Sequence, residues 1–243
     1  MNRHRHTFAM GWAAALLLAV AFCALGGWQW RRMHEKEAML ASVARVIEAK
    51  RAAPLAAAAD PARTKDYDWA EGRGRFLARP AWLLDNQQRA GRTGVRVFRL
   101  FQAEGMAMPL LVELGWLPLP ASRALPAIAP PPSGRQVLRG LLLPPPSPGV
   151  IAAKAQVTPA GERLAIALKP AAIAAELGLP AIAPRVLRLD PALLTGHARD
   201  LDVLPNTLPP ARHLGYAVQW FALAAAVLAI ALVLTLRARS RHE

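Results

Sequence analysis

HLGYAVQWFALAAAVLAIALVLTL, residues 213–236, is the stretch that decides the fold of this chain. The 23 residues from Leu214 to Leu236 carry no formal charge. A helix of that length, rising about 1.5 Å per residue, crosses a hydrocarbon core of about 30 Å. Arginines follow at once, at positions 237, 239 and 241. Because short arginine-rich flanks stay on the cytoplasmic side, we expect a transmembrane helix with a cytoplasmic C-terminal end.

Three side chains near the outer end of this segment attract attention: His213, Tyr216 and Trp220. Spacings of three and four residues bring side chains to one face of a helix. We therefore expect these three to share a face at the membrane surface. The ordinary alternative is an interfacial histidine beside an aromatic belt, which is common at helix entrances.

A second uncharged segment runs from Thr7 to Trp30, after a start that contains Arg3 and Arg5. A cleaved signal peptide is the alternative interpretation, but 24 uncharged residues exceed the usual length of its hydrophobic region. We therefore expect a retained transmembrane helix. With two spans and a cytoplasmic C-terminus, the N-terminus is also cytoplasmic, and the chain between the spans lies in the periplasm of a bacterium.

Small residues recur at every fourth position of the first segment, at Ala15, Ala19, Cys23 and Gly27. A ridge of small side chains lets another membrane helix approach closely. The second segment carries Ala225 and Ala229 at the same spacing. We expect the two segments to pack against each other through these residues.

The region between the spans, about 180 residues, is large enough for one domain with its own core. Residues 33–53 favour an amphipathic helix that continues the first span and ends before Pro54 and Pro61. From residue 67 the pattern changes to short strands, which we expect at 69–77, 81–86, 95–101, 109–117, 136–143 and 185–189. We also expect a turn at 89–94, a short helix at 170–179, and proline-rich surface loops at 126–134 and 143–149.

The predicted fold class is therefore a membrane protein of α+β type, with two transmembrane helices flanking a mostly β periplasmic domain that contains short helices. We place its boundaries as a cytoplasmic N-terminus at 1–6, a first span at 7–30, the periplasmic domain at 31–212, a second span at 213–236 and a cytoplasmic tail at 237–243.

Composition and motifs narrow the possible functions. The net charge is +14, but the arginines are scattered without a basic run or interleaved aromatics, so we do not expect nucleic-acid binding. Cys23 is the single cysteine, which excludes an intramolecular disulfide and a CxxC motif. The chain has no G-x-S-x-G, no HExxH and no glycine-rich phosphate loop, so we do not expect an enzyme.

The acidic residues of the domain have structural interpretations. We expect Asp85 to fix a hairpin through side-chain to backbone hydrogen bonds. Asp200 and Asp202 could reach one metal ion, but a solvated loop explains them better. Glu113 alternates with Val112 and Leu114, so we expect it on the solvated face of its strand.

Four stretches of the chain follow one another in the order found in a known family: GGWQWRRMHEK at 26–36, LLDNQQRAGRTGVRVF at 83–98, LLVELGWLPLP at 110–120 and HLGYAVQWFALA at 213–224. In these stretches the chain resembles the Surfeit locus protein 1 family, which are assembly factors for haem-copper cytochrome c oxidase. The resemblance covers both spans and the domain up to about Pro120, while residues 121–207 add little.

The resemblance implies a non-catalytic role at the inner membrane, in handling haem a while oxidase subunit I matures. Its implied partners are subunit I, haem a synthase and the lipid bilayer. It also implies that His213 ligates haem iron, with Tyr216 and Trp220 as aromatic walls of an apolar slot. The alternative is a scaffold that docks oxidase subunits without binding haem. His34 is a speculative second ligand, and we prefer a solvated position for it among its charged neighbours.

The predicted topology can be tested with a reporter that is active only in the periplasm. Fused at Ser133 it should be active, because the charge flanks place residues 31–212 outside. Fused at Glu243 it should be silent. The reverse pattern would overturn the topology.

Overall fold

The structure is a computed structural model of the chain and describes residues 2–146, 154–204 and 207–240. Its elements are α1 (Asn2–Ala49), β1 (Ala53–Pro54), η1 (Leu55–Ala59), η2 (Pro61–Arg63), β2 (Asp68–Phe76), β3 (Trp82–Arg89), β4 (Arg92–Ala103), β5 (Leu110–Pro118), β6 (Gln136–Leu143), β7 (Gln156–Val157), β8 (Arg163–Ala165), α2 (Pro170–Leu177), β9 (Val186–Leu189) and α3 (Pro210–Arg239). They form two compact units, one from residues 1–41 and 207–243 and the other from residues 42–206.

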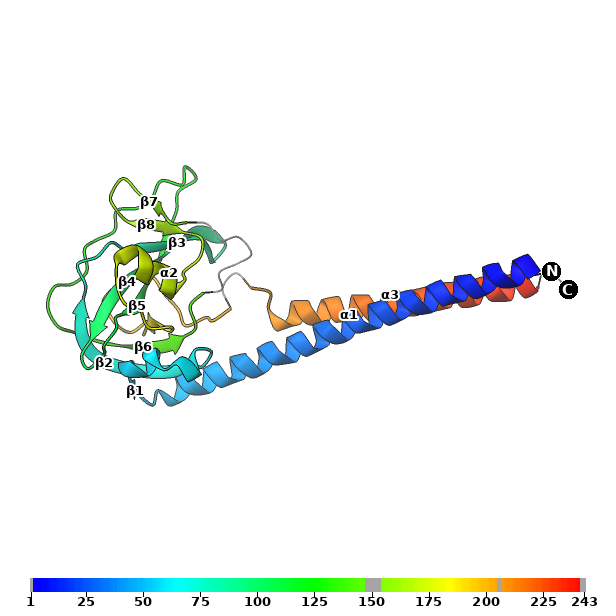
Figure 1. Cartoon of the computed structure of the whole chain (residues 1–243), viewed down its shortest axis with the longest axis horizontal. Coiled ribbons are helices and arrows are strands. Elements are labelled where there is room, and N and C mark those ends of the chain that lie inside the picture. Colours follow the sequence, from blue (N-terminus) through cyan, green and yellow to red (C-terminus); the bar gives the residue numbers. More distant parts are fainter. Residues whose placement is uncertain (1, 147–153, 205–206, 241–243) are drawn as a thin grey trace. The chain divides into compact units, whose positions relative to one another are not determined.

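The first unit is a helix pair in which α1 and α3 lie side by side and run in opposite directions (Figure 1). Both helices are long and apolar enough to cross a membrane, over Phe8–Ala49 and Pro210–Ala238. Only 11% of the most apolar window of each is buried within the molecule, unlike a core helix of a soluble protein. The predicted fold class, two membrane helices flanking a mostly β domain, is confirmed.

The helix predicted at 33–53 continues the first span without a break, because α1 is helical from Asn2 to Ala49. It ends four residues before Pro54, at Lys50, whose φ of 41° is left-handed. Two sequence features cannot be compared with the structure: Arg241 lies outside the described residues, and so does the 147–149 part of the second proline-rich run.

The contact between the two helices follows spacings that alternate between three and four residues. On α1 the wholly or partly buried positions are Ala15, Ala19, Phe22, Gly26, Gln29 and Met33. On α3 they are His213, Ala217, Trp220, Ala224, Val227 and Ala231. An average spacing of 3.5 residues keeps a contact row on one face of two helices that cross at a small angle.

The predicted small-residue ridge is therefore only half right. Ala15 and Ala19 are buried, but Cys23 is exposed and a Cβ atom added to Gly27 would meet no atom within 4 Å. Each step of four residues turns about 40° further round a helix, so a strict four-residue row leaves the contact face after two steps. On α3 the prediction of Ala225 and Ala229 was wrong for the same reason, since both are exposed.

The second unit is a nine-stranded sheet in the order β1-β2-β6-β9-β5-β4-β3-β8-β7 within the described residues. An additional pairing joins β2 to the end of β4, through Gly74 to Phe76 and Phe101 to Ala103. Because of this pairing, β2, β6, β9, β5 and β4 close on themselves as a barrel. The remaining strands extend from the first half of β4.

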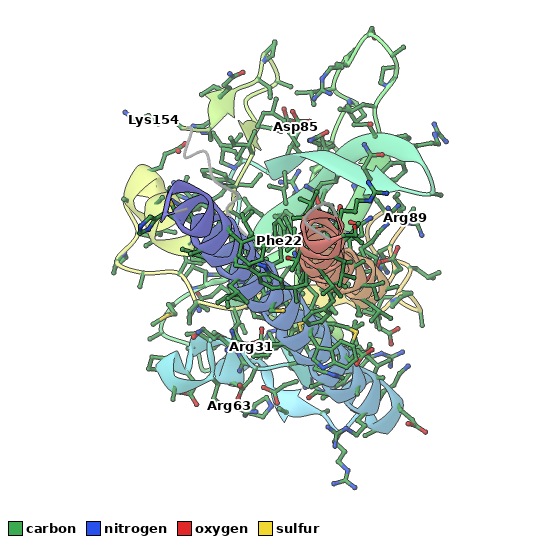
Figure 2. All side chains as sticks on the ribbon, turned by 90° about the vertical axis from the view of Figure 1, so that its right-hand side faces the viewer. Phe22, Arg31, Arg63, Asp85, Arg89 and Lys154 are labelled. Atoms are coloured by element: carbon green, nitrogen blue, oxygen red, sulfur yellow. The ribbon has the colours of Figure 1, made fainter. Side chains whose placement is uncertain are left out.

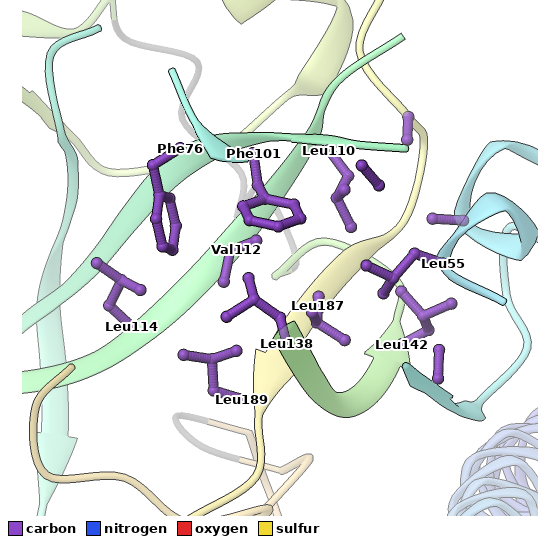
Figure 3. Packing of buried hydrophobic residues seen from close by; sticks show 14 of the residues in the cluster. Leu55, Phe76, Phe101, Leu110, Val112, Leu114, Leu138, Leu142, Leu187 and Leu189 are labelled. Atoms are coloured by element: carbon purple, nitrogen blue, oxygen red, sulfur yellow. The ribbon is translucent and has the colours of Figure 1, made fainter. Parts of the chain in front are cut away.

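Two hydrophobic clusters pack on opposite faces of these strands. One fills the interior of the barrel, with Phe101, Val112, Leu138 and Leu187 among its buried residues (Figure 3). The other lies on the outer face, where α2 contributes Ile173 and Ala174 against Phe98 and Leu111. The alternation of apolar residues along β4 and β5 therefore serves two cores, which is why most of their residues are buried.

The predicted strands and the short helix are confirmed, with boundaries that shift by a few residues. The hairpin turn predicted at 89–94 is narrower, because Arg89 pairs with Arg92 and leaves only Ala90 and Gly91 in the turn. Both turn residues have positive φ, 48° and 74°. Two such residues give the turn type whose twist matches that of the flanking strands.

The prediction for Glu113 was wrong. Its side chain is 1% exposed and lies between Arg96 of β4 and Arg188 of β9. Arg96 donates through Nη1 to one carboxylate oxygen, and Arg188 donates through Nε to the other at 3.0 Å. Alternation did place Glu113 on the face opposite Val112, but the second hydrophobic cluster covers that face.

Removal of the Glu113 charge should destabilise the domain strongly. Glu113→Gln leaves two buried guanidinium groups without a counter-ion, and breaking a buried ion pair in this way costs about 3–5 kcal/mol. Glu104→Gln is the matched control, because Glu104 pairs with Arg135 at the surface and an exposed pair contributes about 1 kcal/mol or less. Denaturant unfolding of the full chain in detergent measures both, and equal losses would contradict the assignment.

A second substitution tests the helix pair. A Cβ atom on Gly26 would lie 2.7 Å from the Phe221 ring, so Gly26→Leu should weaken the packing by about 1–3 kcal/mol. Gly27→Leu introduces the same side chain one residue away, where space is open, and should leave stability unchanged or improved. Thermal unfolding in detergent compares the two variants. A larger loss for Gly27→Leu would restore the four-residue ridge and exclude the contact row.

Candidate functional site

His213 is held at the start of α3, where Pro209 caps the helix and Pro210 is its first residue. The side chain points into the helix pair and is 7% exposed. Its Nδ1 atom lies 2.7 Å from the carboxamide oxygen of Gln29 on α1. A carboxamide oxygen only accepts hydrogen bonds, so Nδ1 carries the ring proton.

The other ring nitrogen of His213 is the chemically unusual atom of the helix pair. With the proton on Nδ1, Nε2 keeps its lone pair, yet it is buried and has no hydrogen-bond partner. Five buried side-chain nitrogens among the described residues lack a partner, and the other four belong to the domain. An unsatisfied buried polar group costs about 1–3 kcal/mol, so such an atom calls for a functional explanation.

Trp220 and Tyr216 do not flank His213 in the same way. Trp220 is partly buried in the contact row and stacks on Phe22 of α1, with ring centroids 5.6 Å apart and planes at 27°. Figure 2 shows Phe22 on α1 next to α3. Tyr216 is 39% exposed and lies outside the row. The structure therefore brings His213 and Trp220 to one face and turns Tyr216 away from it.

His34 lies on the exposed side of α1. Its imidazole bonds to Glu37 at 3.2 Å and packs edge-on against Trp30, with centroids 5.3 Å apart. No described contact joins it to His213. This is the solvated position that we preferred for His34 over a role as second ligand.

The sequence interpretation missed Gln29 and Phe22, the two residues of α1 that contact the predicted site. The signal for Gln29 was present, because it is the only amide side chain between Thr7 and Trp30. A polar residue inside an apolar span usually finds a polar partner on a neighbouring helix. Phe22 gave no comparable signal, since an aromatic residue in a membrane segment is ordinary.

The residues at this position fit the donor chemistry of a haem site. A neutral imidazole with one nitrogen held by an acceptor and the other free is the usual protein ligand for haem iron. The aromatic slot fits less closely, because the stack of Phe22 on Trp220 occupies the place of one wall. The ligand atom is thus prepared, while the space beside it is filled by the chain's own side chains.

The acidic and histidine residues of the domain have local partners instead. Asp85 accepts a hydrogen bond from the Asn86 amide at 2.6 Å, as predicted, and Asp200 pairs with Arg89 at 3.0 Å. Burial lowers the pKa of His197, and the charges of Arg199 and Arg99 lower it further. Among the described residues, no group of three His, Cys, Asp or Glu side chains could hold a metal ion.

Comparison with known proteins identifies a family for most of the chain. The sequence model of the SURF1 family matches residues 16–225. The match begins inside α1, covers the whole domain and ends inside α3, beyond Trp220. A search of curated proteins gave no match. The matched region includes every residue that surrounds His213.

Proposed function

Because the chain belongs to the SURF1 family, a family of cytochrome c oxidase assembly factors, we propose that it handles haem a during the maturation of oxidase subunit I. The role is non-catalytic. His213 is the proposed ligand to haem iron, and its free, buried Nε2 is the observation that carries the proposal. When bound, the haem would offer an open axial position on iron to this nitrogen.

The surroundings of His213 support a ligand that is held and then released. The helix pair provides an apolar setting, which suits a porphyrin. The imidazole is fixed through Gln29 on the partner helix, so a small separation of α1 and α3 would expose Nε2 without unfolding either helix. The proposed partners are haem a synthase, as the source of haem, and subunit I, as its recipient.

A scaffold role is the second candidate, in which the chain docks oxidase subunits without touching haem. One observation favours it: Phe22 stacks on Trp220 and fills the place where the predicted slot would lie. On this view the His213–Gln29 bond only joins the two spans. The two candidates differ in whether pigment accompanies the protein.

Substitution of His213 distinguishes them. Detergent-purified protein from cells that synthesise haem a should show a haem spectrum, and His213→Ala should lose it while remaining inserted in the membrane, because the axial bond is lost. His34→Ala is the matched control and should keep the pigment, since its imidazole is 56% exposed and bonded to Glu37.

The same preparations test the scaffold role if subunit I is probed alongside the pigment. Subunit I that co-purifies equally with the wild type and with His213→Ala, without pigment in either, would establish the scaffold and exclude haem handling. Pigment that survives unchanged in His213→Ala would exclude His213 as the ligand.

A further inference from the structure

We propose that Gln29 is the positioning residue for His213: its carboxamide oxygen fixes the imidazole so that Nε2 alone is available to iron. This inference rests on the proposed haem-handling function and deepens it. Gln29 would not touch the haem. It would act through the Nδ1 proton, in the way that a second hydrogen-bond partner orients most metal-ligating histidines.

The geometry supports this role in two ways. The 2.7 Å contact is short and joins an acceptor on α1 to Nδ1 on α3, so it fixes the ring's rotation as well as its proton. Contacts on both sides of it hold the helices in register. Phe22 stacks on Trp220 further into the pair, and the Lys36 ammonium bonds to the Leu208 carbonyl at the other end.

The choice of an amide also has a chemical consequence. A carboxylate at this position would pull the Nδ1 proton more strongly, which makes Nε2 a stronger electron donor and stabilises ferric over ferrous iron. It would also carry a charge into the apolar region, where charged groups are costly. A neutral amide orients the ring without either effect.

The competing explanation is that Gln29 merely joins the two spans. The chain contains a comparison for this, because Trp12 donates to the Thr235 hydroxyl at 3.0 Å near the opposite end of the pair. Trp12→Phe removes a hydrogen bond between the spans without affecting His213. A bond that serves only packing should behave alike at both places.

The first experiment concerns the proton and needs no haem. In detergent-purified full-length protein labelled with 15N-histidine, NMR should show the His213 signal with Nδ1 protonated and Nε2 unprotonated. The signal is assigned by its absence from His213→Ala. Gln29→Leu should shift it toward a mixture of the two tautomers, whereas Trp12→Phe should not. An unchanged tautomer in Gln29→Leu would overturn the inference.

The second experiment titrates haemin into the same protein. Gln29→Leu should weaken binding about 10- to 100-fold, the usual effect of removing such a partner. Gln29→Glu, of nearly the same size, should keep binding but move the midpoint potential of the bound haem to a more negative value. Gln219→Leu, an exposed glutamine of α3, is the matched control and should match the wild type.

The outcomes separate the inference from the function beneath it. Haemin that binds equally to the wild type and to His213→Ala would overturn the ligation and the role of Gln29 together. Haemin lost from His213→Ala, but bound with wild-type affinity and potential by both Gln29 variants, would overturn only the role of Gln29. Gln29→Glu keeps the test decisive if Gln29→Leu fails to insert.

Discussion

The close packing of α1 on α3 is the constraint on which the candidate site depends. Lipid offers no water to satisfy a polar group, so the amide of Gln29 and the imidazole of His213 must find each other or remain unpaired. Small residues in the contact row, above all Gly26 beneath the Phe221 ring, allow the helices to approach closely enough for this. The position of His213 is thus set by residues that have no chemistry of their own.

The domain satisfies a similar demand with charge. Glu113 lies beneath the outer hydrophobic cluster and needs both Arg96 and Arg188, which come from the two strands that pair with β5. Buried ion groups of this kind contribute less to stability than to choosing one arrangement, because any other register would leave a charge unpaired. The cluster therefore fixes β4, β5 and β9 relative to one another.

The candidate site combines a prepared ligand atom with a closed surrounding. Nε2 of His213 has its lone pair free and no partner, yet the Phe22–Trp220 stack fills the neighbouring space. A carrier that must give up its cargo has use for such an arrangement, because the chain's own aromatic contact can replace the one made to the cargo. A permanent cofactor site would have no need of this competition.

The sequence by itself determined the two spans, the mostly β domain, nearly every strand and His213 as the residue of interest. These follow from local signals: an uncharged run of membrane length, alternation of apolar residues, and a histidine at a helix entrance. Only the tertiary structure decided the contact partners. A four-residue ridge and a 3.5-residue row share Ala15 and Ala19 and part only at Gly26 and Gly27, and the burial of Glu113 depends on what covers its strand. Gln29 became part of the site for the same reason, since its partner is 184 residues away and no local pattern in the chain records that distance.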